Sequence, residues 1–387
     1  MAQTGSPAAY EGLGIAARYL GDHAGAVAAH ERGYRVARSG TDVEAAARLA
    51  VQLALDAYGQ ARMAEANGWV ERAIVLTDGR ATSEARALAL ALRGHVAMLA
   101  RNDPGQALEL AGRALAAARA AGSTDVELIA LALQGLALVC VGAIEEGMGR
   151  LDLATAAAVA GEVRDVDLAE TICCYLIDAC KRVRDLERAA EWCVRVAEIA
   201  TRFEDRFMFA VCRVHHADIL VWRGDWEQAD HELTAASGLL GRIGAVRSAD
   251  CLVRLAELRR RQGRRDEAAA LLARCETHRL HALHSGLLAL DRDAPDEALD
   301  EARRFLRRIG PADRFERVPG LELVVRAALR AGDMTSAGAA AAELRAIADR
   351  AATGPLRGAA LLAEGRVAAA GGARERARVL LRDAAEA

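Results

Sequence analysis

Apolar segments of helical period alternate with turn residues along this chain, and the turns recur about every 40 residues. Gly142 shows the pattern clearly, because a small residue follows it after five positions (Gly147) and another after seven more (Ala154). Comparable spacing follows Gly21, Gly224, Gly263, Gly332 and Gly372. Since only small side chains let two helix backbones approach closely, each such site predicts a helix crossing.

The turns divide the sequence into about ten helix pairs, and no segment alternates as a β-strand would. First helices are predicted at 8–20, 42–58, 82–101, 124–141, 165–183, 204–223, 245–262, 279–291, 315–331 and 353–370. Their partners are predicted at 23–38, 62–77, 104–121, 143–160, 186–202, 226–242, 265–276, 296–309, 334–350 and 373–386. Capping residues such as Asp42 and stop residues such as Gly122 support these boundaries.

Composition favours helices packed on helices. The chain is 53% hydrophobic with only 4% aromatic residues, and it is rich in the strong helix formers Ala, Leu, Arg and Glu. A net charge of −3 is nearly neutral for 387 residues, whereas a general nucleic-acid binder normally carries a basic excess. We therefore expect no direct nucleic-acid binding by this chain.

The spacing of turns and small residues resembles the tetratricopeptide family, in which a small residue precedes the turn glycine by seven positions. Gly135 before Gly142 and Ala217 before Gly224 are examples. The units are longer than the usual 34 residues of that family, and its terminal proline is mostly missing. The resemblance implies an all-α, right-handed superhelical solenoid, and we expect residues 1–387 to form a single array.

A second resemblance is to the helical-repeat region of LuxR-type transcriptional regulators of high-GC bacteria. It is carried by Ala190-Glu191-Trp192-Cys193, by the segment from Ala210 to Ala217, and by Trp222-Arg223-Gly224-Asp225-Trp226. Such regulators combine a sensing array with a C-terminal helix-turn-helix and sometimes an N-terminal nucleotide-binding module. Neither a helix-turn-helix nor an NTPase module is recognisable here, and the sequence ends at Ala387 within a repeat helix.

In arrays of this kind the first helices line the concave side, and residues just beyond the small crossing position point into the groove. This register predicts a mixed-charge groove in the fifth to seventh units, formed by Cys174, Asp178, Lys181, Arg182, Asp218, Trp222, Asp250, Glu257, Arg260 and Arg261. Arg and Trp are frequent anchors for a bound peptide or helix. The alternative is a solvated charge network with Trp222 filling a gap. We expect a protein or peptide partner, or a small effector, and leave homo-oligomerisation open.

Motifs for catalysis and cofactors are mostly missing. Lys181 is the only lysine and follows no glycine-rich loop, so a Walker A site is excluded and no cofactor is expected. An enzymatic alternative would use His215, His216, Asp178 and Asp218 as acid–base groups in a solenoid tunnel. A stand-alone adaptor in a multiprotein assembly is a further alternative to a LuxR-type role.

Cysteine and histidine clusters raise a metal or thiol-sensor hypothesis, which we rank below core packing because no CxxC or HxxxH pair occurs. The first cluster comprises Cys173, Cys174, Cys180, Cys193 and Cys212 near His215 and His216. The second comprises Cys275, His278, His281 and His284, spaced by three residues. No metal is expected at either cluster.

The location of the protein is predicted from its cysteines and from its most apolar segment. Cysteines within helical patterns and the lack of a recognisable signal peptide at the start favour a reducing cytoplasm. The longest apolar run, Leu128 to Ile144, is nearly long enough to cross a bilayer. It contains Gln134 and two glycines, so we expect a buried solenoid helix and no membrane association.

Overall fold

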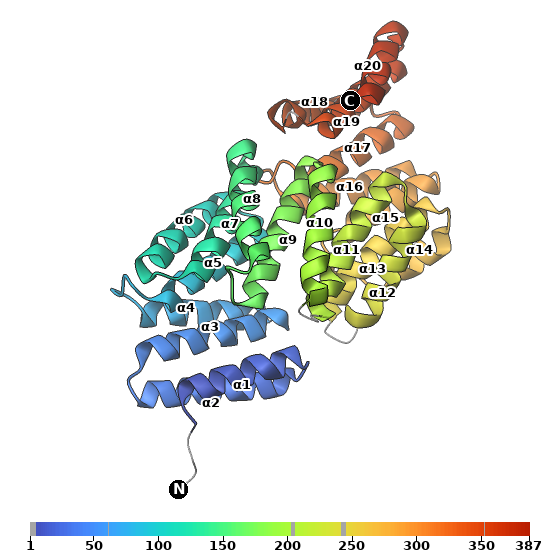
Figure 1. Ribbon diagram of the computed structural model, residues 1–387. Helices are drawn as coiled ribbons and strands as arrows, with labels where there is room; N and C mark the ends of the chain where they lie inside the picture. Colours follow the sequence, from blue (N-terminus) through green and yellow to red (C-terminus); the bar gives the residue numbers. More distant parts are fainter. Residues whose placement is uncertain (1–4, 61, 203–205, 241–244, 352) are drawn as a thin grey trace. The chain divides into compact units, whose positions relative to one another are not determined.

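A computed structural model describes residues 5–60, 62–202, 206–240, 245–351 and 353–387, in which twenty helices and no strand are found (Figure 1). The first helices of the ten hairpins are α1 (Pro7–Tyr19), α3 (Val43–Gly59), α5 (Glu84–Leu99), α7 (Thr124–Val141), α9 (Val166–Val183), α11 (Arg206–Arg223), α13 (Ala245–Arg261), α15 (His281–Asp291), α17 (Val318–Ala331) and α19 (Gly354–Ala370). Their partners are α2 (His23–Ser39), α4 (Met63–Leu76), α6 (Pro104–Ala121), α8 (Ile144–Ala160), α10 (Leu186–Arg202), α12 (Trp226–Leu240), α14 (Arg265–Leu272), α16 (Pro295–Ile309), α18 (Met334–Ala351) and α20 (Arg374–Glu386). Every helix boundary falls within four residues of its predicted position, so the all-α prediction is confirmed.

Local sequence explains where the helices start and stop. The side chain of Asp42 accepts a hydrogen bond from the backbone N–H of Ala45 at 3.0 Å, which satisfies an otherwise unpaired donor at the start of α3. Pro104 occupies the first turn of α6, where its missing N–H costs nothing. The same helix ends at Gly122, whose φ of 69° is the left-handed conformation that favours glycine.

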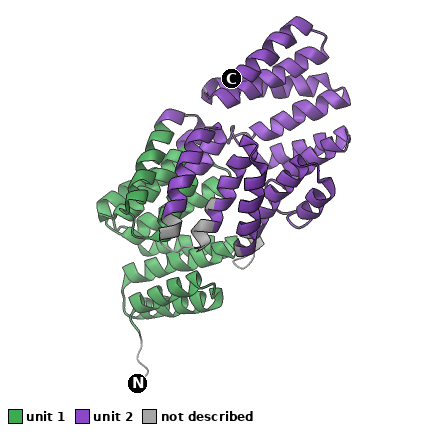
Figure 2. Cartoon of the chain, turned by 45° about the vertical axis from the view of Figure 1, so that its right-hand side comes forward, with its two compact units in different colours: residues 1–137, 146–175, 242–246 green, residues 138–145, 176–241, 247–387 purple. Residues whose placement is uncertain are grey.

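The chain folds into two compact units (Figure 2). Unit 1 comprises residues 1–137, 146–175 and 242–246, and unit 2 comprises residues 138–145, 176–241 and 247–387. Within each unit, a helix packs against its hairpin partner and against the neighbouring hairpin, as α1, α2 and α3 do in unit 1 and α15, α16 and α17 do in unit 2. Both units are therefore built from the same repeating hairpin.

Small residues lie at the helix crossings as the spacing predicts. Ala154 in unit 1 and Ala229 in unit 2 are fully buried. At Gly135 in α7 the helix backbones approach closely, because an added Cβ would lie 2.7 Å from the backbone oxygen of Gly147 and 2.8 Å from Leu151 Cγ in α8. Only glycine fits there without moving the facing helix backbone.

One helix of the described residues, α7, is long and apolar enough to cross a bilayer, with a mean hydropathy of 1.8. In the fold, 72% of this helix is buried against other protein segments. The apolar side chains of Thr124–Val141 thus pack against other parts of the protein, as the sequence analysis expects.

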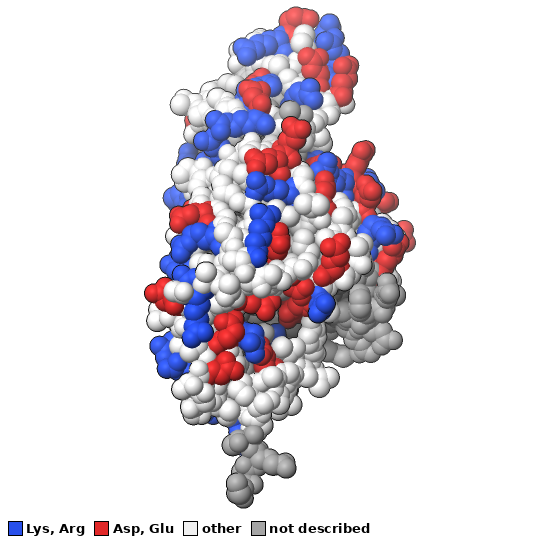
Figure 3. Space-filling model, turned by 60° about the vertical axis from the view of Figure 1, so that its left-hand side comes forward, with Lys and Arg blue, Asp and Glu red and all other residues white. Residues whose placement is uncertain are grey.

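Charged side chains of both signs are interspersed on the molecular surface drawn in Figure 3. Basic and acidic residues lie beside one another over much of that face, in keeping with 51 basic and 54 acidic residues in the sequence.

Candidate functional site

The inner faces of α9, α11, α13, α15 and α17 line a cavity of about 270 Å³ within unit 2. Eight of the ten predicted groove residues line it: Asp178, Lys181, Arg182, Asp218, Trp222, Glu257, Arg260 and Arg261. They lie in α9, α11 and α13, the first helices of three consecutive hairpins. Because equivalent positions in these helices face the same side, one register along the sequence predicted all eight.

Two predicted residues lie elsewhere. Asp250 does not line the cavity but supports it, because its carboxylate bonds Arg254 Nη1 at 2.9 Å and His278 Nε2 at 3.0 Å. Cys174 belongs to unit 1 and is partly buried. The register therefore includes one residue too many in α9, because the division between the two units falls after residue 175, within this helix.

A buried arginine joins α9 to the loop that precedes α17. The Arg182 side chain is 3% exposed and pairs with Asp178 at 2.9 Å, with Glu316 at 3.1 Å and with Asp313. Burial tends to raise the pKa of Asp178, but the charges of Arg182 and Arg279 outweigh it and lower that pKa to about 2. Burial raises the pKa of Asp313 despite the same arginine. The ion pair between Arg182 and Asp313 thus joins segments of the cavity wall that are 131 positions apart in the sequence.

Arg184 occupies a turn position at which most other hairpins use glycine. Its φ is 58°, close to the conformation of the turn residue Gly332 (78°), and an L side chain is strained there. The guanidinium bonds both oxygens of Glu322, at 3.0 and 2.7 Å, and lies 5.0 Å from the ring centre of Trp222. Strained residues of this kind cluster at functional sites.

Trp222 is the most exposed of the three aromatic residues that line this cavity, at 48%, whereas Phe305 and Phe315 are buried. The guanidinium of Arg261 lies 5.5 Å from its ring centre, in addition to that of Arg184. Such cation–π contacts hold a ring in place and leave part of its surface open to a ligand.

Carboxylates pair the remaining cations of α9 and α13. Asp218 binds Lys181 and also Arg254, the latter at 2.7 Å. Burial tends to raise the pKa of Asp218, but these two cations outweigh it and lower that pKa. Glu257 bonds Arg260 and Arg261 at 2.8 Å each. These charged side chains therefore already have ion-pair partners within the protein.

The cavity also has an apolar part that the sequence analysis missed. It is lined by Leu186, Val221, Leu280, Leu283, Leu287, Phe305, Phe315, Val318, Pro319 and Leu323. Missed polar residues are Arg184, Arg254, Arg279, His284, Glu316, Glu322 and Arg326. Extending the same register to the eighth and ninth first helices would have found several of them, whereas the loop before α17 has no repeating pattern to follow.

Of the four candidates for acid–base groups, Asp178 and Asp218 line the cavity, whereas His215 and His216 do not. Burial and the charges of Lys181 and Arg254 lower the pKa of His215 to about 3, so its ring is neutral at physiological pH. Its Nδ1 is buried without a hydrogen-bond partner among the described residues. Asp178 and Asp218 hold their protons even less readily because they are ion-paired. Burial lowers the pKa of His216 as well. Structural ion-pair networks perturb pKa values as catalytic sites do, so these shifts do not by themselves indicate an acid–base role.

The cysteines of the first cluster behave as core residues. Cys173, Cys180 and Cys193 are at most 3% exposed, and burial raises the pKa of Cys193 to about 12. The side chain of Cys212 lies outside the described residues. A thiol with such a pKa is protonated and unreactive at neutral pH.

The second cluster is dispersed in the fold. Cys275 packs in an apolar cluster with Leu252 and Leu288, while His278 bonds Asp250 and His284 bonds Glu257. Within the ranges that the structure describes, no group of three His, Cys, Asp or Glu side chains is arranged to hold a metal ion.

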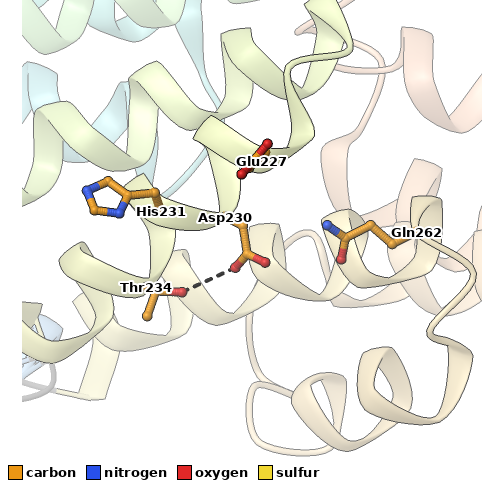
Figure 4. A pocket seen from close by; sticks show the side chains of 5 residues that line it. All are labelled: Glu227, Asp230, His231, Thr234 and Gln262. Carbon is orange, nitrogen blue, oxygen red and sulfur yellow. Dashed lines mark hydrogen bonds between the residues drawn. The ribbon is translucent and has the colours of Figure 1, made fainter.

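A second depression of about 440 Å³ lies on the outer surface of unit 2 (Figure 4). Four of its residues come from α12 and the fifth, Gln262, follows α13. Both oxygens of Asp230 are already bonded by Arg259, at 2.6 and 2.7 Å, and Thr234 donates to Asp230 at 3.2 Å. The depression is shallow and its five lining residues include no aromatic or aliphatic anchor, so it is a weak candidate for binding.

Unit 1 contains a buried polar network that the sequence analysis did not predict. Asp56 bonds His30 Nδ1 at 2.5 Å and Arg18 at 3.1 Å, and Arg18 continues to Asp167 at 3.1 Å. Gly14 makes room for the histidine, because an added Cβ would lie 2.2 Å from His30 Nε2. This network links α1, α2, α3 and the first turn of α9 and has a packing role.

Comparison with protein-family models gives no match, and comparison with curated proteins gives none either. Among solved structures, a Rap protein complexed with competence and sporulation factor superposes with a TM-score of 0.55 and 11% identity, covering 96% of this chain and 99% of that chain. The chain has a tetratricopeptide-like fold. The apo form of RapI gives a TM-score of 0.45 with 10% identity, covering 98% and 96% of the two chains. A human IFIT1 dimer with PPP-AAAA gives 0.42 with 13% identity, covering 98% and 90%. None of these structures links this tetratricopeptide-like chain to LuxR-type regulators.

Proposed function

We propose that this protein is a non-catalytic interaction scaffold that binds a peptide, or an extended segment of a partner protein, in the cavity lined by α9 to α17. The observation that carries the proposal is the half-exposed Trp222 ring, which contacts two guanidinium groups and lines a cavity with both apolar and charged walls. Trp and Arg are enriched among residues that dominate binding energy. Fixed charges around an apolar pocket are well suited to set the register of a peptide.

The Rap protein offers limited support from a similar fold. Its structure was determined in a complex with competence and sporulation factor. At 11% identity the likeness concerns the architecture, so the choice of a peptide ligand for this chain rests on the cavity itself.

The test is a screen of bead-bound random short peptides with fluorescently labelled protein. The Trp222→Ala variant is screened in parallel, and Trp226→Ala is the matched control, because Trp226 is 37% exposed in α12 and does not line the cavity. Selected peptides are expected to bind Trp222→Ala at least about tenfold more weakly and Trp226→Ala as tightly as the parent. Equal binding by the parent and Trp222→Ala, or no selected peptide, would overturn the proposal.

The regulatory context is a separate part of the proposal. A LuxR-type role requires an attached or recruited DNA-binding module that responds when the cavity is filled, and such coupling needs different ligand affinities in two states. Sequencing the gene beyond the codon for Ala387 tests this: a helix-turn-helix there supports the role, and a stop codon favours the stand-alone adaptor.

A further inference from the structure

Among the cations that line the cavity, Arg326 has no carboxylate partner in the described part of the chain. The seven others each have one within 2.9 Å: Lys181, Arg182, Arg184, Arg254, Arg260, Arg261 and Arg279. Arg326 lies in α17 and is partly buried, but it makes no ion pair or hydrogen bond with any described residue. Partial burial weakens the hydration of a charge, so a counter-charge supplied by a ligand would stabilise this guanidinium.

The acidic residues of α15 and α17, Asp291 and Glu322, already bind other arginines. Glu322, one helical turn before Arg326, uses both of its carboxylate oxygens to bind Arg184. Asp291 bonds Arg260 Nη1 at 2.5 Å. The described residues of α15 and α17 therefore supply no free counter-charge to Arg326.

A second arginine without an ion-pair partner in the described ranges lies in α19, a helix that packs against α17. Arg366 in α19 is likewise partly buried and free of ion pairs with the described residues. Burial, together with the charges of Arg366 and Arg260, lowers the pKa of Arg326, against a weaker opposing effect of Asp291. Nearby like charges disfavour the charged form of an arginine, and a bound anion would relieve this repulsion.

We propose that Arg326, reinforced by Arg366, binds a carboxylate group of the peptide that occupies the cavity, so that the preferred ligand is acidic at one end. This inference rests on the function proposed above. The carboxylate comes from an Asp or Glu side chain or from the C-terminus of the peptide. Guanidinium and carboxylate groups match in a bidentate geometry, and such a bond is stronger in a cavity partly shielded from water.

The experiment uses the full chain and three bead-bound peptide libraries. The first has free C-termini and contains Asp and Glu, the second is amidated and contains both residues, and the third has free C-termini and lacks them. Arg326→Met removes the charge and keeps most of the side-chain volume, while Arg326→Lys keeps the charge. Arg357→Met is the matched control, because Arg357 is exposed on α19 and has no ion pair with a described residue.

Peptides that bind in a Trp222-dependent manner are expected to be enriched in carboxylates. Selection from the second library identifies the side chain as the source, and selection from the third identifies the C-terminus. Affinity for these peptides should fall about tenfold or more in Arg326→Met, remain largely intact in Arg326→Lys, and stay unchanged in Arg357→Met.

Two outcomes separate this inference from the function on which it rests. Trp222-dependent peptides without carboxylate enrichment, or with equal affinity for Arg326→Met and the parent, would overturn the anion site and leave the peptide proposal standing. A screen without Trp222-dependent peptides would remove both. Circular dichroism of each variant confirms that a lost affinity does not reflect unfolding.

Discussion

Replacing Gly135 by alanine tests whether close helix crossings determine this fold. The added Cβ would lie 2.7 Å from the backbone oxygen of Gly147 and 3.2 Å from the backbone nitrogen of Leu151, so α8 must shift to accept it. Overpacking of this kind costs about 1–3 kcal/mol. Alanine also stabilises a helix over glycine by about 1 kcal/mol, and this gain partly conceals the cost in the single variant.

The matched control is Gly149→Ala, in α8 itself. Nothing lies within 4 Å of a Cβ added at Gly149, so this variant gains the helix propensity and meets no obstacle. The free energy of unfolding should therefore be about 1–3 kcal/mol lower in Gly135→Ala than in Gly149→Ala. Urea denaturation followed by circular dichroism measures the difference. Equal stabilities would show that the crossing at Gly135 tolerates a methyl group, and would refute the argument from small residues.

Three further predictions concern unit 2. Arg182→Met leaves the buried Asp313 without its ion-pair partner and should lower the free energy of unfolding by about 3–5 kcal/mol in urea denaturation. A loss below about 1 kcal/mol would contradict the stabilising role of this ion pair. Arg184→Gly relieves about 1–2 kcal/mol of backbone strain, so stability should change little while peptide affinity falls in a direct titration; unchanged affinity contradicts a binding role. The pKa of His215 is about 3 in the fold and about 6.5 in the unfolded chain, so this residue should lower the free energy of unfolding as the pH drops below about 6.5, by about 2 kcal/mol at pH 5. The His215→Leu variant should lose this contribution to the pH dependence of stability. An identical pH profile in the variant and the parent contradicts the prediction.

The repeating part of the structure was predictable from the sequence because each hairpin carries its own signals. Turn glycines, capping residues and small crossing positions act within about 40 residues, and they placed all twenty helices. The first helices of the fifth to seventh hairpins share one register, so Asp178, Asp218 and Glu257 could be assigned to one face before their contacts were known. The repeat period thus predicted the part of the cavity wall that α9, α11 and α13 form.

Contacts between segments that are distant in the sequence or lack a repeat pattern could not be predicted from the period of the repeats. Asp313 and Glu316 reach Arg182 from a loop without a repeat pattern, and no local signal pairs residues 131 positions apart. Arg184 was missed because an arginine in a glycine position looks like a degenerate turn. Cys174 was misplaced because the register carries no information about where one compact unit ends and the next begins.

The central claim is that the inner faces of α9 to α17 form the binding site. Hydrogen exchange of the full chain, measured with and without a peptide selected on beads, tests it most directly. The account predicts protection by the peptide at residues 178–186, 218–222, 254–261 and 318–326. Protection confined to the outer depression at residues 227–234 and 262, with no change along the inner faces, would contradict it.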